Sequence, residues 1–244
     1  MYKLLVLDID GTIVRDNVVS SLVESAIKNV SVDVSLCTGR SIKDTLNLSD
    51  RLSLSGLHVA ENGSKIINSQ GDHLYDQALD PELSLKVLDI IQDIGFGKTY
   101  ICSGGEDRLG EIKDHYSISR ISVLGLNRAE ANQLLAGLDI MKGIRAHSYP
   151  SSDQLGVDVQ NQDTDKGTAL RELRCILGLK KEKVLGVGDG YNDISMFSEI
   201  GYKVAMGNAV RELKEIADYV CPPLESDGVA YVINKFMGGV NGSR

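Results

Sequence analysis

Short apolar runs recur along the chain, and each is followed by a cluster of polar residues and then by a pattern typical of a helix. Runs of this kind are typical of strands in a parallel sheet that is buried on both faces. Helical patterns between the runs indicate crossover connections. The sequence therefore predicts an α/β fold with parallel strands at residues 4–7, 32–37, 57–60, 184–187 and 202–206.

The polar clusters stand where these predicted strands end. In an open parallel sheet, ligands bind beyond the carboxyl ends of the strands, because the loops converge there and helix N-termini point at the ligand. We therefore expect one functional rim. Its predicted parts are Asp8-Ile9-Asp10-Gly11-Thr12, Thr38-Gly39-Arg40, Glu61-Asn62-Gly63, Gly188-Asp189-Gly190 and Gly207-Asn208-Ala209.

The middle of the chain has a different pattern. A hairpin is expected at residues 65–75, and a helix is expected to begin at Pro81 and to stop at Gly95. Beyond this helix the pattern predicts strands at 98–102 and 118–124, a helix at 128–138, and strands at 144–147 and 155–159. A helix and two strands, repeated, are typical of an α+β domain. We therefore expect a core of residues 1–79 and 163–244, with an inserted domain of residues 80–162.

Four acids are candidates for the chemistry of the rim. Asp8 and Asp10 flank one residue at the end of the first strand, and Asp189 and Asp193 follow a distant strand. Carboxylates concentrated at one rim repel one another unless a cation lies among them, and carboxylate oxygens suit Mg²⁺. A carboxylate can also attack phosphorus when a cation offsets the charge of the phosphate. Taken singly, Asp10 or Asp193 could instead cap a helix, and the first pair could be a solvated turn.

Lys166 and Thr38 are candidates for binding phosphate. Lys166 stands in the first turn of a helix predicted to extend to Leu177, where a positive charge is unfavourable for the helix dipole. Its ammonium group could neutralise a phosphate near Asp8, or it could form a salt bridge with a nearby acid. The hydroxyl of Thr38 and the backbone N–H of Gly39 can bind a phosphate oxygen, although Thr-Gly also serves as an ordinary turn.

The composition excludes several other kinds of protein. The formal net charge of −8 argues against a nucleic-acid partner, which requires a concentrated basic surface. The cysteines are far apart, without a CxxC pair, so we expect reduced thiols rather than a zinc site or a disulfide framework. The first apolar run ends at Asp8, too early for a signal peptide or a membrane span. We expect a cytoplasmic monomer or homodimer with no membrane partner.

Taken in order, four segments resemble the four motifs of the haloacid dehalogenase superfamily. They are Asp8-Ile9-Asp10-Gly11-Thr12, Thr38-Gly39-Arg40, Asp165-Lys166-Gly167 and Gly188-Asp189-Gly190-Tyr191-Asn192-Asp193. Glu61-Asn62-Gly63 and Gly207-Asn208-Ala209 are similar to elements of its Cof-like branch, subfamily IIB. The resemblance implies a Rossmann-like core with a C2-type cap domain inserted between the second and third motifs. It covers the core, whereas the cap matches only in position and in its order of strands and helices.

The resemblance also implies a role for each site residue. Asp8 would be the nucleophile and a ligand of Mg²⁺. Asp10 would protonate the leaving alcohol and then activate water, and its backbone carbonyl would bind the metal. The other implied roles are metal binding by Asp189, binding of the metal or of its waters by Asp193, phosphoryl binding by Thr38, Gly39 and Lys166, and support of the substrate or of Asp8 by Asn62 and Asn192.

The resemblance therefore implies a Mg²⁺-dependent phosphomonoesterase that forms an aspartyl-phosphate. The cap resembles those of phosphoglycolate phosphatases and, less closely, of sucrose-phosphate phosphatases, so we expect phosphoglycolate or a sugar phosphate as the substrate. A phosphomannomutase-like sugar phosphomutase is the main alternative, because it shares the four motifs. A receiver-like module that is phosphorylated on aspartate, and a regulatory protein that has lost activity, are the others.

Overall fold

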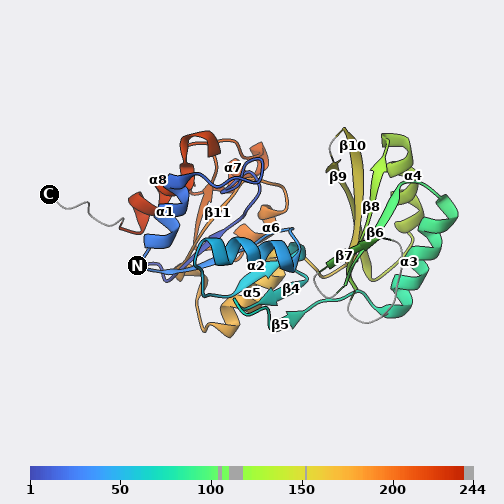
Figure 1. Ribbon diagram of the computed structural model, residues 1–244, viewed down its shortest axis with the longest axis horizontal. Coiled ribbons are helices and arrows are strands. Elements are labelled where there is room, and N and C mark those ends of the chain that lie inside the picture. Colours follow the sequence, from blue (N-terminus) through green and yellow to red (C-terminus); the bar gives the residue numbers. More distant parts are fainter. Residues whose placement is uncertain (104–105, 110–117, 152, 239–244) are drawn as a thin grey trace. The chain divides into compact units, whose positions relative to one another are not determined.

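The computed structural model describes residues 1–103, 106–109, 118–151 and 153–238 (Figure 1). The chain divides into two compact units. The first contains Met1–Arg40, Asp44–Tyr75 and Asp165–Arg244, and the second contains Ser41–Lys43 and Asp76–Thr164. Within the described residues, no helix has the length and apolar character needed to cross a bilayer.

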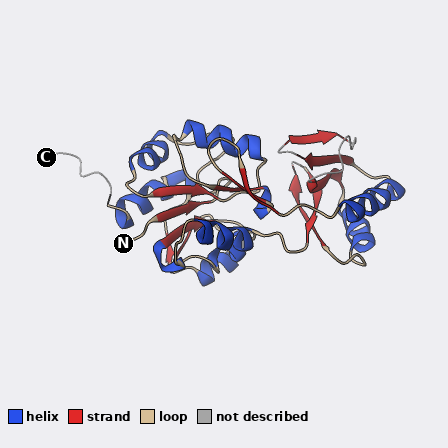
Figure 2. Ribbon diagram, turned by 90° about the horizontal axis from the view of Figure 1, so that it is seen from below, coloured by secondary structure: helices blue, strands red, loops and turns tan. Residues whose placement is uncertain are grey.

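A five-stranded parallel sheet forms the centre of the first unit. Its order is β13 (Tyr219–Val220), β12 (Tyr202–Ala205), β11 (Val184–Gly188), β1 (Leu4–Leu7) and β2 (Asp33–Leu36). Every residue of β1 and β11 is buried, as the uninterrupted apolar runs require of strands covered on both faces. Helices flank the sheet on both sides (Figure 2). They are α1 (Ser21–Asn29), α2 (Ile42–Arg51), α5 (Lys166–Ile176), α6 (Asp193–Phe197), α7 (Arg211–Ile216) and α8 (Gly228–Phe236).

One predicted parallel strand has a different partner. β3 (His58–Ala60) pairs antiparallel with β4 (Lys65–Ile67), and with β5 (His73–Asp76) they form a separate three-stranded sheet. A bridge between Cys37 and Val59 connects this sheet to the end of β2. The cause is the short turn η1 (Glu61–Gly63), in which all residues have positive φ, so that the chain reverses directly after Ala60.

The second unit is a five-stranded antiparallel sheet with two helices against one face. The strand order is β7 (Glu106–Leu109), β6 (Lys98–Ser103), β8 (Ile118–Leu126), β10 (Gln154–Asn161) and β9 (Ile144–Ser151). The helices α3 (Pro81–Ile94) and α4 (Arg128–Leu138) begin at the capping side chains of Asp80 and Asn127. Alternate apolar residues of the strands pack with these helices into one core, for example Ile121 and Val157 with Val87 and Leu134. The predicted α/β core and α+β insert are thus confirmed, although β7 was not expected.

Candidate active site

The register of the sheet brings distant acids together. Asp8 directly follows β1 and Asp189 directly follows β11, and these neighbouring strands pair Leu7 with Val187. The backbone N–H of Asp8 donates to the carbonyl of Val187 (3.0 Å), so Asp8 extends the hydrogen-bonded pairing of β1 with β11 by one residue. Parallel strands that end in register deliver their following residues to the same edge. The two predicted acidic segments therefore meet, as the resemblance implied.

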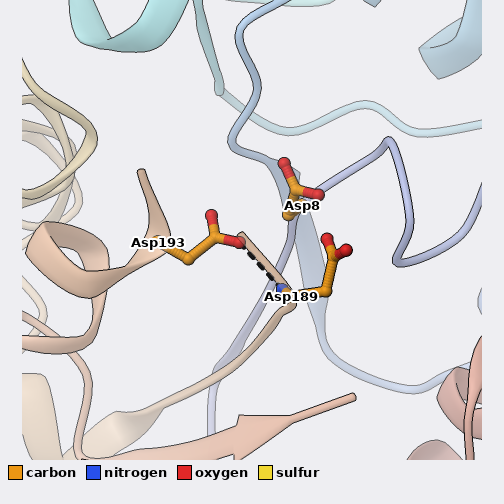
Figure 3. A group of neighbouring side chains, drawn as sticks. All are labelled: Asp8, Asp189 and Asp193. Carbon is orange, nitrogen blue, oxygen red and sulfur yellow. Dashed lines mark hydrogen bonds between the residues drawn. The ribbon is translucent and has the colours of Figure 1, made fainter. Parts of the chain in front are cut away.

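Asp8, Asp189 and Asp193 form an acidic cluster at this edge (Figure 3). Each offers a carboxylate oxygen, and these atoms all lie within 4.8 Å of one another. Asp8 and Asp193 are buried, and Asp189 is half-buried. The Oδ2 atom of Asp193 accepts from the backbone N–H groups of Asp189 and Gly190, both at 2.9 Å, which fixes the loop that carries Asp189. The hydroxyl of Thr12 donates to Asp189 Oδ1 (3.1 Å).

Lys166 neutralises part of this cluster. Its Nζ atom donates to Asp8 Oδ1 (2.6 Å) and to Asp193 Oδ1 (2.7 Å), and its side chain is fully buried. The helix α5 that carries it begins at Asp165, whose carboxylate accepts from the N–H of Thr168 and so offsets the unfavourable lysine in the first turn. Burial alone would lower the pKa of Lys166, but the charges of Asp193 and Asp8 outweigh it and raise that pKa.

The electrostatics of the cluster fit a divalent cation. Burial and repulsion from Asp193 raise the pKa of Asp8, against the opposing effect of Lys166. Burial, with repulsion from the same acid, raises the pKa of Asp189 to about 6. Buried carboxylates that are costly to ionise together, with oxygen as the donor atom, match what a hard divalent cation requires. Asp193 is fully buried and both of its oxygens accept short hydrogen bonds, of 2.7 Å and 2.9 Å. Asp189 is half-buried and accepts longer ones, of 3.1 Å and 3.4 Å, so Asp8 and Asp189 are the better candidates for direct ligands.

Asp10 lies apart from the acidic cluster. Its carboxylate is 62% exposed and forms a two-point ion pair with Arg40, with Oδ1 at 2.5 Å from Nη2 and Oδ2 at 2.9 Å from Nε. The backbone after Asp10 turns sharply, because the N–H groups of Thr12, Ile13 and Val14 all point at the carbonyl of Ile9. Sequence spacing alone placed Asp8 and Asp10 together; the structure directs one carboxylate inward and the other outward.

The remaining predicted residues form a connected chain of contacts along the rim. Thr38 is buried, its hydroxyl accepts from the N–H of Arg40 (3.1 Å), and its carbonyl accepts from the N–H of Asn62 (2.9 Å). The amide of Asn192 donates to Asn62 Oδ1 (3.0 Å). A Cβ atom on Gly39 would lie 2.9 Å from that same oxygen, so only glycine leaves room for the asparagine. Asn192 directly precedes Asp193, so these contacts link the motifs of β2, η1 and β11.

Asn208 and Gly11 both lie against Asp189, and the sequence pattern placed them on the rim without an individual role. The amide of Asn208 donates to the carbonyl of Gly11 (2.8 Å) and lies 3.4 Å from Asp189 Oδ2. Gly11 has φ +82°, and a Cβ atom there would lie 2.1 Å from the same oxygen. The polar cluster after β12 was the available signal for Asn208. Its hydrogen-bond acceptor, the carbonyl of Gly11, is however 197 residues away along the chain.

Known proteins resemble this chain along its whole length. The sequence model of one protein family, the haloacid dehalogenase-like hydrolases, matches residues 5–128 and 106–233. Phosphoglycolate phosphatase 1 of Saccharolobus solfataricus is 29% identical over 98% of this chain and 97% of its own. A 5-amino-6-(5-phospho-D-ribitylamino)uracil phosphatase of Bacillus subtilis is 26% identical, with 96% of each chain covered.

A solved structure resembles the fold over nearly its full length. The haloacid dehalogenase-like hydrolase from Bacteroides thetaiotaomicron has a TM-score of 0.85 and 25% identity, and the match covers 96% of this chain and 99% of that one. The two fitted segments of the family model together extend from before Asp8 to beyond Asp193. The chain therefore belongs to the haloacid dehalogenase-like hydrolase family, and it is a phosphatase.

Proposed function

We propose that this phosphatase hydrolyses a small phosphate monoester with the help of Mg²⁺, by way of a phosphoryl group transferred to Asp8. The observation that carries the proposal is the position of Asp8. It is a buried carboxylate at the end of a central strand, 2.6 Å from the ammonium of Lys166 and within 4.8 Å of the ligand atoms of Asp189 and Asp193. A carboxylate is a poor nucleophile towards an anionic phosphate unless positive charge lies beside it.

In the first step, an oxygen of Asp8 attacks phosphorus and the bond from phosphorus to the leaving-group oxygen breaks. The electron pair of that bond stays on the leaving oxygen, which takes a proton from Asp10. In the second step, water attacks phosphorus, gives a proton to Asp10, and the bond to Asp8 breaks, which releases inorganic phosphate. The Lys166 ammonium and the donors of Thr38 and Gly39 would bind the phosphoryl oxygens in both steps.

Asp8 and Asp189 would hold Mg²⁺, together with the backbone carbonyl of Asp10. Asp193 would support these two ligands indirectly, since its carboxylate accepts hydrogen bonds from Lys166 and from the backbone of the Asp189 loop. The bound cation supplies charge neutralisation for the carboxylates and the phosphate, so that the two anions can approach. Asn62 and Asn192, which are hydrogen-bonded to each other, would orient the substrate or Asp8.

We propose phosphoglycolate or a sugar phosphate as the substrate. The support is the name of the relative with 29% identity, a phosphoglycolate phosphatase, and the small α+β unit inserted into the core. A lid that excludes bulk water from a reaction can enclose only a leaving group of matching size, so a small inserted domain suits small esters. A screen of phosphate release from phosphoglycolate, hexose phosphates, disaccharide phosphates and nucleotides identifies the class. Turnover that depends on a sugar bisphosphate activator would instead indicate a phosphomutase.

Asp8→Asn tests the proposal. The variant is expected to fold and to lose nearly all turnover, because an amide oxygen does not attack phosphorus. Asp50→Asn, an exposed acid on α2, is the matched control and is expected to keep full activity. Chelation with EDTA is expected to abolish phosphate release from the wild type, and added Mg²⁺ to restore it. Full activity of Asp8→Asn would rule out the proposed nucleophile, and activity that EDTA leaves intact would rule out the metal.

A further inference from the structure

Arg40 is the residue that holds the carboxylate of Asp10. Its Nη2 and Nε atoms bind Oδ1 and Oδ2 at 2.5 Å and 2.9 Å, so that the guanidinium and the carboxylate meet side by side. The Asp10 side chain is 62% exposed, whereas Arg40 is only 21% exposed. An exposed carboxylate on a turn would otherwise rotate freely, and a two-point contact removes that freedom. The arginine is thus the more firmly placed of the two partners.

Contacts from three segments fix Arg40 itself. Its N–H donates to the hydroxyl of Thr38 (3.1 Å), and its carbonyl accepts from the N–H of Glu61 (2.9 Å). Its Nη2 atom also lies 3.5 Å from Oδ1 of Asn17, in a turn where Asp16 and Asn17 both have positive φ. Arg40 therefore contacts the loop after β1 through its guanidinium, and the loop after β2 and η1 through its backbone. Any freedom of Asp10 is limited by segments that also carry Thr38 and Asn62.

We propose that Arg40 is a positioning residue for the reaction, which sets where the Asp10 carboxylate gives and takes its proton. The proposal rests on the proposed role of Asp10 as the acid and base of the two steps. General acid–base groups act only from a defined position beside the reacting oxygen. Lysine could supply the same charge but not the planar two-point contact. The position of Asp10 therefore depends on the geometry of the pair and not on its charge alone.

The other possible role of Arg40 is direct binding of the substrate phosphate. The two roles predict different effects of Arg40 substitutions on the hydrolysis rates of alkyl and aryl esters. A 4-nitrophenolate group leaves without a proton, whereas an alkoxide needs one from Asp10. The ratio kcat/KM reports the first step, up to release of the leaving group. Loss of positioning therefore lowers kcat/KM selectively for alkyl esters, while loss of phosphate binding lowers it for all esters alike and raises KM.

The experiment compares Arg40→Gln, Arg40→Lys and Asp10→Asn on 4-nitrophenyl phosphate and on phosphoglycolate and glucose 6-phosphate. With the alkyl esters, Arg40→Gln is expected to lower kcat about ten- to a hundredfold with KM little changed, and Arg40→Lys to remain at least about tenfold below wild type. With the aryl ester, kcat/KM is expected to stay within about threefold of wild type for both variants, because it does not include the later hydrolysis of the aspartyl-phosphate, in which Asp10 activates water. In the Asp10→Asn background, Arg40→Gln is expected to add less than about twofold, because both changes remove the same function.

Arg51→Gln is the matched control, because Arg51 makes a similar pair with Glu24, through Nε (3.2 Å) and Nη2 (2.9 Å), between α2 and α1. It is expected to leave kcat on every ester unchanged. Equal losses of kcat/KM on aryl and alkyl esters, additive losses in the double variant, or wild-type rates in Arg40→Lys would each overturn the proposal. These outcomes are separable from failure of the proposed function itself, which Asp8→Asn reports. If Asp8→Asn is inactive and Arg40→Gln acts equally on all esters, only the role of Arg40 is wrong.

Discussion

A buried histidine makes the stability of the core depend on pH. His58 lies on β3 and is fully buried. Its Nδ1 atom accepts from the backbone N–H of Leu36 on β2 (3.2 Å), which requires that nitrogen to be unprotonated. Its Nε2 atom is 2.7 Å from the hydroxyl of Ser49 on α2, which in turn donates to the carbonyl of Leu54. A neutral ring thus joins β2, β3 and α2, and protonation would cost the contact with Leu36.

The magnitude follows from the pKa of His58. Burial lowers the pKa from 6.5 to about 4 in the folded protein. The unfolded chain therefore binds the proton more readily than the folded one, so this contribution to stability is complete above pH 6.5 and is lost as the pH falls towards the folded value. Linkage gives a loss of about 2 kcal/mol between about pH 7.5 and pH 5, and about 3 kcal/mol by about pH 4.

Urea denaturation at a series of pH values measures this loss. His58→Gln is neutral at every pH, so its unfolding free energy should fall less steeply, by about 2 kcal/mol over the same interval. Other acids titrate equally in both proteins, and the difference between the two curves isolates the histidine. His73→Gln, at an exposed position on β5, is the control and should reproduce the wild-type curve. Parallel curves for wild type and His58→Gln would refute the reasoning. So would a pKa near 6.5 for His58 by NMR, which needs no variant.

Three further predictions concern the acidic cluster. Gly11→Ala places a Cβ atom 2.1 Å from Asp189 Oδ2 at φ +82°, so the Mg²⁺ concentration for half-maximal activity should rise at least about tenfold in kinetic titration. Asn208→Ala removes the amide that donates to Gly11 and should weaken Mg²⁺ activation by about ten- to a hundredfold, with about 0.5–1.5 kcal/mol lost in urea denaturation, the usual net contribution of a hydrogen bond that is not buried. Lys166→Met leaves Asp8 without its cation and should destabilise the metal-free protein by about 3–5 kcal/mol in EDTA. Added Mg²⁺ should recover part of that stability, and an unchanged denaturation midpoint would contradict the buried ion pair.

Local signals predicted many elements of the fold closely. The helix at residues 128–138 has the predicted bounds, because Asn127 and Glu130 form a capping box that the sequence encodes within four residues. Gly95 likewise ends α3 in the left-handed conformation. β3 was placed correctly as a strand but in the wrong kind of sheet. Its pairing depends on the positive φ of Glu61 and Asn62, which are non-glycine residues that rarely adopt it, so periodicity carried no sign of the reversal.

The same contrast holds for the site. Asp8 and Asp189 could be placed together from the sequence, because parallel strands with acids at their ends have few alternatives. The directions of the side chains could not be predicted in this way. Asp10 is paired with Arg40, 30 residues away, and its outward direction depends on how the backbone turns after Ile9. Such directions come from tertiary packing, which no pattern of apolar and polar positions contains.

Lys166 shows that two interpretations of one residue need not exclude each other. The sequence left open a salt bridge to nearby acids and a role beside a phosphate. The ammonium forms the salt bridge, to Asp8 and Asp193, and the acid it contacts is the proposed nucleophile. When ionised, the three carboxylates of the cluster outweigh its single positive charge by two. A divalent cation would cancel that excess, whereas an anionic phosphate would add to it. The charge balance therefore favours binding of the cation before the substrate.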